Sequence, residues 1–291
     1  MTNLNTILKN YFYPPPVSGD ACAELLRHEI LASKASMIAR FGSNEIKAVL
    51  YPKIPFLLKP FFKYRVASRM RDVAGFFSLS KGMIERFSDM MIDDMKLLDV
   101  LGSWRIEEIL LLKHFPSAHR IELNALEPYL SLNPWSEALA GLKVLVVHPF
   151  NTTIERQYHE KRQFLFNDNR VLPKFKTLMT VKAVQTVAGN KSEFNDWFDA
   201  LDYMKTEIDS KDYDVAILGC GAYGFPLAAH VKRMGKKAIH LGGATQILFG
   251  IMGKRWDNHP RISSLYNEYW VRPAPEDTPQ HINKVEGGCY W

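Results

Sequence analysis

Short apolar runs that end in glycine, proline or a polar residue recur at five places along the chain. They cover positions 36–42, 142–150, 180–189, 213–221 and 236–243. Runs of this length without polar alternation are typical of strands buried on both faces of a parallel sheet. Helical patterns separate several of them, so the chain is predicted to alternate strands with helices.

The clearest helical pattern covers positions 192–208, where apolar residues recur at helical spacing after a candidate cap at Ser192. The interval 43–140 holds two more amphipathic helical stretches, at 86–104 and 105–115, and no predicted strand. We therefore expect an α/β fold with a doubly wound, mostly parallel, Rossmann-like sheet. The chain is expected to form a single α/β domain over 1–291, with 43–140 as a helical insertion or subdomain after the first strand.

A glycine turn follows the fourth predicted strand. Gly219, Gly221 and Gly224 satisfy the G-x-G-x-x-G spacing between a strand and a helix, which lets backbone approach a phosphate at the helix N-terminus. A dinucleotide site would place Asp or Glu about 20 residues later, and His240 stands there instead. The three glycines and His240 are candidate substrate-binding residues. The alternative is that the glycines only permit a tight turn.

A cation and a carboxylate follow the first predicted strand, which delivers Arg40, a glycine turn at Gly42 and then Glu45 in the opening turn of a helix. Ligands of open α/β sheets bind at this carboxyl edge, so Arg40 and Glu45 are candidate catalytic residues. The alternative is structural: Ser43 would cap the helix, while Glu45 would face the helix dipole and pair with Arg40.

The segment RFGSNE, positions 40–45, resembles the Arg-Phe-Gly-Asp-Gly-Glu segment of the GT-D-type glycosyltransferases. That Rossmann-like family uses nucleotide-sugar donors and an Asp-x-Glu metal motif. The resemblance implies transfer of a sugar from a nucleotide diphosphate donor to a cell-surface glycan or lipid-linked precursor. Because Ser43 replaces the first carboxylate, only Glu45 carries over, and we expect no metal site made by the protein alone. The donor diphosphate could still complete a shell for Mg²⁺ or Mn²⁺.

Basic residues follow the second predicted strand and recur in a later turn region, where they could bind the diphosphate of a sugar donor. His148 ends the second predicted strand, Arg156 follows it, and Lys254, Arg255 and Arg261 lie in a later turn region. Fixed cations can stabilise the charge that develops on a leaving group. His148 is therefore a candidate catalytic residue, and Arg156, Lys254 and Arg255 are candidate substrate-binding residues. The alternative for His148 is a histidine that only packs in the core, and the alternative for Arg156 is a position on a solvated helix face.

Positions 51–65, YPKIPFLLKPFFKYR, interleave aromatic and aliphatic residues with cations and three prolines. This composition is typical of an interfacial membrane patch and favours a lipid-linked acceptor. The alternative is a proline-broken loop packed on its own domain. The stretch 269–291 is rich in proline and glycine but ends in two aromatic residues, so we expect it to pack onto the body of the protein.

Charge and composition indicate which kinds of partner and site this protein can have. The formal net charge of +6 favours anionic partners, but no nucleic-acid-binding motif is present. Three distant cysteines indicate neither a disulfide framework nor a zinc site. Without a signal peptide or a membrane-spanning stretch, we expect a cytoplasmic protein, peripheral on the membrane if 51–65 binds lipid. Competing interpretations are an NAD oxidoreductase, an S-adenosylmethionine methyltransferase, and a non-catalytic membrane-surface protein of envelope-polymer assembly.

Overall fold

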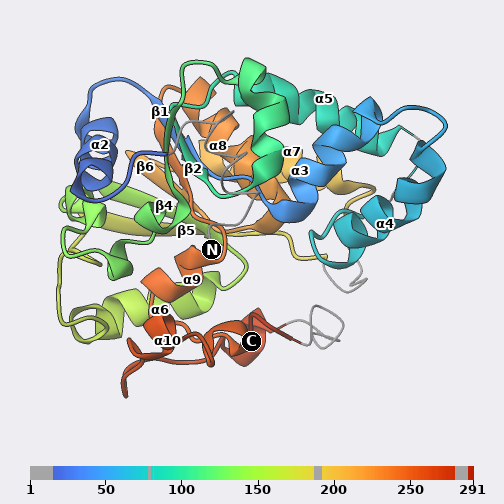
Figure 1. Ribbon diagram of the computed structural model, residues 1–291. Helices are drawn as coiled ribbons and strands as arrows, with labels where there is room; N and C mark the ends of the chain where they lie inside the picture. The colour runs from blue at the N-terminus through green and yellow to red at the C-terminus, as the bar shows by residue number, and fades with distance from the viewer. Residues whose placement is uncertain (1–15, 78–79, 81, 187–191, 279–287) are drawn as a thin grey trace.

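The computed structural model describes residues 16–77, 80, 82–186, 192–278 and 288–291. Its seven strands form one all-parallel sheet in the order β3-β2-β1-β7-β6-β4-β5 (Figure 1). This confirms the predicted Rossmann-like α/β fold. The strands are β1 Ser36–Ala39, β2 Val100–Ser103, β3 His119–Glu122, β4 Lys143–His148, β5 Thr177–Lys182, β6 Val215–Leu218 and β7 Lys237–His240.

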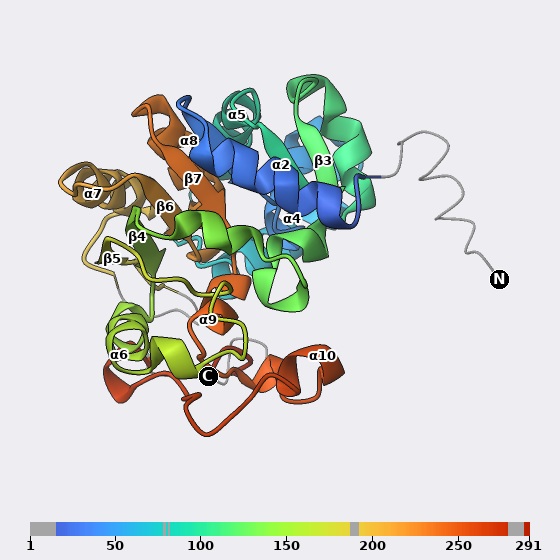
Figure 2. The same ribbon diagram turned by 90° about the vertical axis from the view of Figure 1, so that its left-hand side faces the viewer.

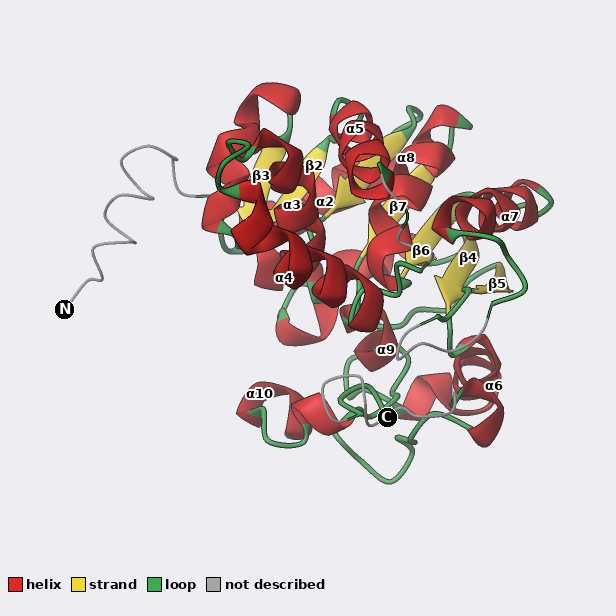
Figure 3. Cartoon of the chain, turned by 90° about the vertical axis from the view of Figure 1, so that its right-hand side faces the viewer, coloured by secondary structure: helices red, strands yellow, loops and turns green. Residues whose placement is uncertain are grey.

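Helices cover both faces of the sheet (Figures 2 and 3). One face packs against α3 Ser43–Leu50, α5 Met83–Met95, α7 Trp197–Asp209 and α8 Gly224–Arg233. The other face packs against α2 Asp20–Leu31, α6 Asn151–Lys161, α9 Ala244–Leu248 and the 3₁₀ segment η5 Trp135–Leu139. Helix α4 Lys59–Asp72 lies at the periphery beside α3, and α10 Pro260–Ser263 lies near the C-terminus.

Successive residues of each inner strand face opposite layers, because side chains alternate along a strand. In β4, Val144 and Val146 enter one core while Leu145 and Val147 enter the other, and all four are buried. Side chains on both faces of these strands must therefore be apolar, so the sequence of each strand is a nearly continuous apolar run.

The sheet order places a topological switch between β4 and β6. After β4 the chain crosses through α6 to β5, whereas after β6 it crosses through α8 on the opposite face to β7. The two connections leave in opposite directions, so a crevice opens between the carboxyl ends of these neighbouring strands. The topology thus favours ligand binding at this edge before any side chain is considered.

The interval 43–140 differs from the sequence-based expectation, because it contributes the sheet strands β2 and β3 as well as helices. The stretch 86–104 is helical only as far as Met95 and ends in β2, and 105–115 forms the 3₁₀ segment η2 Ile106–His114. Strand β2 is only four residues long, and in the edge strand β3 only Ile121 is buried. Strand β2 is buried, but its four residues directly follow a helical pattern, and the polar residues of β3 leave no apolar run in the sequence.

The structure also differs from the prediction in the bounds of one strand and in the cap of one helix. The strand expected at 180–189 runs from Thr177 to Lys182, and positions 187–189 of that expectation lie outside the described residues. Helix α7 is capped by Asp196 and not by Ser192, since the Asp196 carboxylate accepts the backbone N–H groups of Phe198 and Asp199 at 2.7 and 3.0 Å. Asp196 is the residue nearest the helix that has a capping side chain.

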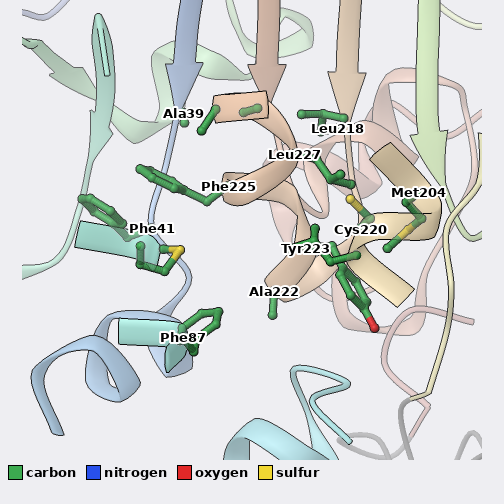
Figure 4. Packing of buried hydrophobic residues seen from close by; sticks show 14 of the residues in the cluster. Ala39, Phe41, Phe87, Met204, Leu218, Cys220, Ala222, Tyr223, Phe225 and Leu227 are labelled. Carbon is green, nitrogen blue, oxygen red and sulfur yellow. The ribbon is translucent and has the colours of Figure 1, made fainter. Parts of the chain in front are cut away.

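Aromatic packing fixes the start of α8 against the ends of β1 and β6 (Figure 4). The ring of Phe225 stacks on Phe41, which follows β1, with centroids 4.9 Å apart. Tyr223 stacks on Trp197 of α7 with centroids 4.6 Å apart. These contacts hold the turn after β6 rigidly at the carboxyl edge of the sheet.

Candidate functional site

A cavity of about 600 Å³ lies at the carboxyl edge of the sheet. Its walls come from the segments that follow β1, β4, β5, β6 and β7, together with the C-terminal residues. It includes the crevice between β4 and β6, and its volume is in the range of small-molecule sites. Of the predicted site residues it brings together Arg40, Glu45, His148, Gly219, Gly221, His240 and Arg255.

The Glu45 carboxyl group lies in the first turn of α3, directly against Gly42. A side chain at Gly42 would occupy the place of this carboxyl group, which explains the glycine. Burial raises the pKa of Glu45, while hydrogen bonds from its own backbone N–H, the N–H of Asn44 and the charge of Arg40 oppose the rise. Ser43 is the first helical residue, and the N-cap is Gly42, so the predicted Ser43 cap does not form.

Arg40 packs on the ring of Trp104. Its guanidinium is 4.8 Å from the Trp104 ring centroid, and the indole N–H of Trp104 donates to the backbone oxygen of Phe41 at 2.8 Å. Burial lowers the pKa of Arg40, and the charges of Glu45 and Glu127 oppose that effect. Arg40 is thus a partly buried cation that packs on an indole ring and interacts electrostatically with two carboxyl groups.

Glu127 is a second carboxyl group in the cavity wall that sequence analysis missed. It joins the 3₁₀ segments η3 Leu123–Leu126 and η4 Pro128–Leu130. Burial raises its pKa, and a hydrogen bond with Tyr129 and the charges of Arg40, His259 and Arg261 oppose the rise. No sequence motif marks Glu127, because its segment is 3₁₀ and lies far from Glu45 along the chain.

His148 and His240 are both buried in the wall, and burial lowers the pKa of each to about 3, so both rings are neutral. The backbone N–H of Phe150 donates to Nδ1 of His148 at 2.9 Å. The proton of neutral His148 therefore sits on Nε2. His148 can donate a hydrogen bond there but is poorly suited to act as a base. Among the described residues, the buried Nδ1 of His240 has no hydrogen-bond partner.

Two of the three motif glycines are explained by these histidines. A Cβ atom at Gly219 would lie 2.6 Å from Cδ2 of His148, and one at Gly224 would overlap the ring of His240. Gly221 has φ +57°, a left-handed conformation that glycine adopts at little cost. Gly219 and Gly221 line the cavity, whereas Gly224 is not among the described residues that line it.

The C-terminal residues close another side of the cavity. Tyr290 and Trp291 line it, and the hydroxyl of Tyr290 accepts a hydrogen bond from Arg255 at 2.8 Å. The amide nitrogen of Gln246 donates to the backbone oxygens of Tyr290 and Met252 at 2.8 and 3.0 Å. This orientation leaves Oε1 of Gln246 buried, with no partner among the described residues. The expected packing of the C-terminal stretch is confirmed for residues 269–278 and 288–291; its positions 279–287 lie outside the described residues.

Arg156 and Lys254 take no part in the cavity wall as described. Arg156 lies on the exposed face of α6, where its guanidinium contacts the Glu276 carboxylate at 3.1 Å. The side chain of Lys254 is exposed, and its backbone N–H donates to the oxygen of Trp291 at 3.2 Å. The structure instead adds His259 to the wall, and it also places Arg261 there.

The residues around Glu45 do not fit a divalent metal site built by the protein alone. Within the described part of the chain, no three His, Cys, Asp or Glu side chains form a group that could hold a metal ion. Ser43 offers no carboxylate, and the charge that acts on Glu45 is the guanidinium of Arg40. A divalent cation at Glu45 would be repelled by that guanidinium.

Comparison with known proteins gives one structural likeness. No family model and no curated protein matches the chain. A solved structure described as a selenomethionine-substituted structure of domain of unknown function 1792 covers 94% of this chain and 96% of its own. The two share 13% sequence identity and a TM-score of 0.47. At these values the likeness assigns neither a family nor a function to this chain.

Proposed function

We propose that the chain is a glycosyltransferase that moves a sugar from a nucleotide diphosphate donor to a cell-surface glycan or lipid-linked precursor. The observation that carries the proposal is that Arg40, Glu45 and Glu127 line one aromatic-walled cavity, close enough for their charges to interact. Cations suit a diphosphate, aromatic rings suit a base or sugar face, and a partly buried carboxylate suits an acceptor hydroxyl.

In this reaction the bond from the anomeric carbon to the diphosphate breaks, and a bond to the acceptor oxygen forms. The acceptor hydroxyl loses its proton, which Glu45 takes, because burial raises the affinity of its carboxylate for a proton. Arg40 and Arg255 stabilise the negative charge of the leaving diphosphate. The charge of Glu127 favours the charged form of Arg40, and the N–H of His148 binds a ligand oxygen.

Polar wall residues suit a ligand rich in hydroxyl or N–H groups, such as a sugar or a base. Gln246 and His240 both line the cavity. Oε1 of Gln246 and Nδ1 of His240, however, are covered by protein and have no partner among the described residues. The absence of a carboxylate at His240 disfavours the ribose contact of an NAD enzyme.

Calorimetry against UDP, GDP, CMP and their sugars, with NAD and S-adenosylmethionine alongside, tests the ligand class. Donor hydrolysis and transfer are then compared between wild type and Glu45→Gln, which keeps the shape of the side chain but cannot accept a proton. We expect Glu45→Gln to lower turnover by about 10²-fold or more. Glu160→Gln, an exposed change on α6, is the matched control.

Three results would reject the proposal. Binding of NAD or S-adenosylmethionine without binding of any nucleotide sugar would assign the cavity to another enzyme class. Full activity in a folded Glu45→Gln enzyme would remove Glu45 from the chemistry. Nucleotide-sugar binding without hydrolysis or transfer by the wild type, tested with glycan and lipid-linked acceptors, would leave a binding protein that does not catalyse.

A further inference from the structure

The segment before and within α4 exposes a group of large apolar side chains. Phe56, Leu57, Phe61 and Tyr64 are 84, 82, 79 and 81% exposed, and Leu58 and Phe62 are also exposed. Along α4, the spacing of Phe61, Tyr64 and Arg65 places them on one face, opposite the buried Met70. We call this surface the α4 face, defined by the six apolar residues together with Arg65 and Arg69. Apolar side chains gathered this densely on a surface indicate an interaction site.

The segment that carries the α4 face is rich in cations, and only at its end does a carboxylate, Asp72, pair with one of them, Arg71, at 2.7 Å. Between positions 46 and 71 the sequence contains seven Lys and Arg residues and no Asp or Glu. These cations are Lys47, Lys53, Lys59, Lys63, Arg65, Arg69 and Arg71. A second copy of this chain would bring the same positive charge against the face, and the repulsion would oppose a dimer. An anionic surface is complementary to it.

The C-terminal end of α4 leads directly into the cavity wall. Helix α4 ends at Asp72, and the next three residues, Val73, Ala74 and Gly75, line the cavity. The oxygen of Gly75 accepts the hydroxyl of Thr186, another wall residue, at 2.5 Å, which ties this segment to the region after β5. In Figure 1, α4 projects at the edge of the molecule, away from the sheet. A surface bound to α4 would therefore lie beside the cavity.

We propose that the α4 face docks on an anionic lipid bilayer and so presents the cavity to an acceptor anchored in that bilayer. Phe56, Leu57, Phe61 and Tyr64 enter the headgroup region, and Arg65 and Arg69 contact lipid phosphates. No helix in the described residues is long and apolar enough to cross a membrane. The choice of a lipid-linked acceptor rests on the proposed transferase function, whereas the docking itself does not.

Sedimentation with vesicles of phosphatidylglycerol and phosphatidylcholine in equal parts tests the docking. We expect the wild type to bind these vesicles, to bind pure phosphatidylcholine weakly, and to lose binding as salt is added. Arg65→Gln with Arg69→Gln should weaken binding roughly 10-fold or more, at the scale expected for two juxtamembrane cations. Phe56→Ser with Leu57→Ser and Phe61→Ser should abolish it.

Matched controls change equally exposed residues elsewhere. Lys174→Gln with Lys176→Gln removes two exposed cations beside the amino end of β5, and Leu31→Ser with Leu132→Ser removes two exposed apolar side chains. Both controls should bind vesicles as the wild type does. Because all the altered side chains are exposed, the variants should keep the unfolding transition of the wild type.

Several outcomes overturn the docking proposal. Wild type that does not bind anionic vesicles, or α4-face variants that bind as the controls do, would refute it. A concentration-dependent dimer that the triple serine variant loses, without vesicle binding, would assign the face to a second copy. Docking without faster transfer to lipid-linked than to water-soluble acceptors would reject only the choice of acceptor. Docking by a wild type that transfers no sugar would reject only the transferase function.

Discussion

Gly224 was predicted to contact a ligand, but the structure makes it a packing residue for His240. The backbone of Gly224 is helical, with φ −60° and ψ −43°. Alanine in a helix is normally more stable than glycine by about 0.5–1 kcal/mol. The new Cβ atom, however, would overlap the ring atoms Nε2 and Cδ2 of His240. That ring has little room to move away, since only 5% of the residue is exposed.

Overpacking of a buried site costs about 1–3 kcal/mol, which exceeds the helix gain. We therefore expect Gly224→Ala to lower the free energy of unfolding, by up to about 2.5 kcal/mol after the two effects are combined. Urea unfolding followed by circular dichroism measures this difference. At about 2–4 °C per kcal/mol for chains of this size, a thermal scan should show the same loss.

Removal of the His240 ring supplies the control. In a His240→Ala background the Cβ atom added at position 224 faces vacated space, so Gly224→Ala should there stabilise the protein by about 0.5–1 kcal/mol. The sign of the effect should thus reverse between the two backgrounds. Gly224→Ala that stabilises the wild type, or the same loss in both backgrounds, would refute the packing explanation.

Three more predictions follow from the site. Burial lowers the pKa of His148 from its ordinary 6.5 to about 3 in the folded state. Between these two pH values only the unfolded state binds the proton, so the free energy of unfolding falls as the pH drops from about 6.5 to 3. His148→Asn should make the pH slope of the unfolding free energy shallower by about 1.4 kcal/mol per pH unit between about pH 6 and pH 4, and an unchanged slope would contradict the burial of a neutral ring. Gly221→Val, at φ +57°, should destabilise the protein by more than Gly221→Asn, because asparagine tolerates left-handed backbone better; equal urea midpoints would argue against this conformation. Transfer by the wild type should be insensitive to EDTA, while Ser43→Asp, which restores paired carboxylates, should make it EDTA-sensitive; strong inhibition of the wild type would show that metal supplies charge in place of Arg40 and Arg255.

The inner strands were predictable because a strand buried on both faces needs apolar residues at successive positions, and such a run is visible in the sequence. In β4, β6 and β7 nearly every residue must be apolar, so the runs stand out and their order indicates a Rossmann-like fold. Strand β2 is also buried along its whole length, but its four residues directly follow a helical pattern and could not be distinguished from it. Strand β3 lies at the sheet edge and buries only Ile121, so its polar residues look like a loop.

The core of the site was predictable for a similar reason. Arg40, Glu45, His148 and the glycines after β6 directly follow strands, and the carboxyl ends of parallel strands meet at one edge. Their spacing therefore placed them together without any knowledge of the packing. The purpose of Gly219 and Gly224 was not predictable, because it depends on which histidine ring lies opposite each of them.

Only the tertiary structure decided the rest of the cavity. Glu127 comes from a 3₁₀ junction after the outer strand β3, and Gln246 and Tyr290 are joined by a hydrogen bond across 44 positions. Such contacts depend on how loops fold back over the sheet edge, and loops follow no hydrophobic period that a sequence could reveal. The sequence by itself determined the layers and the edge at which ligands bind, because hydrophobic burial is periodic. The second carboxyl group and the C-terminal wall were decided by long-range packing, which has no local signature.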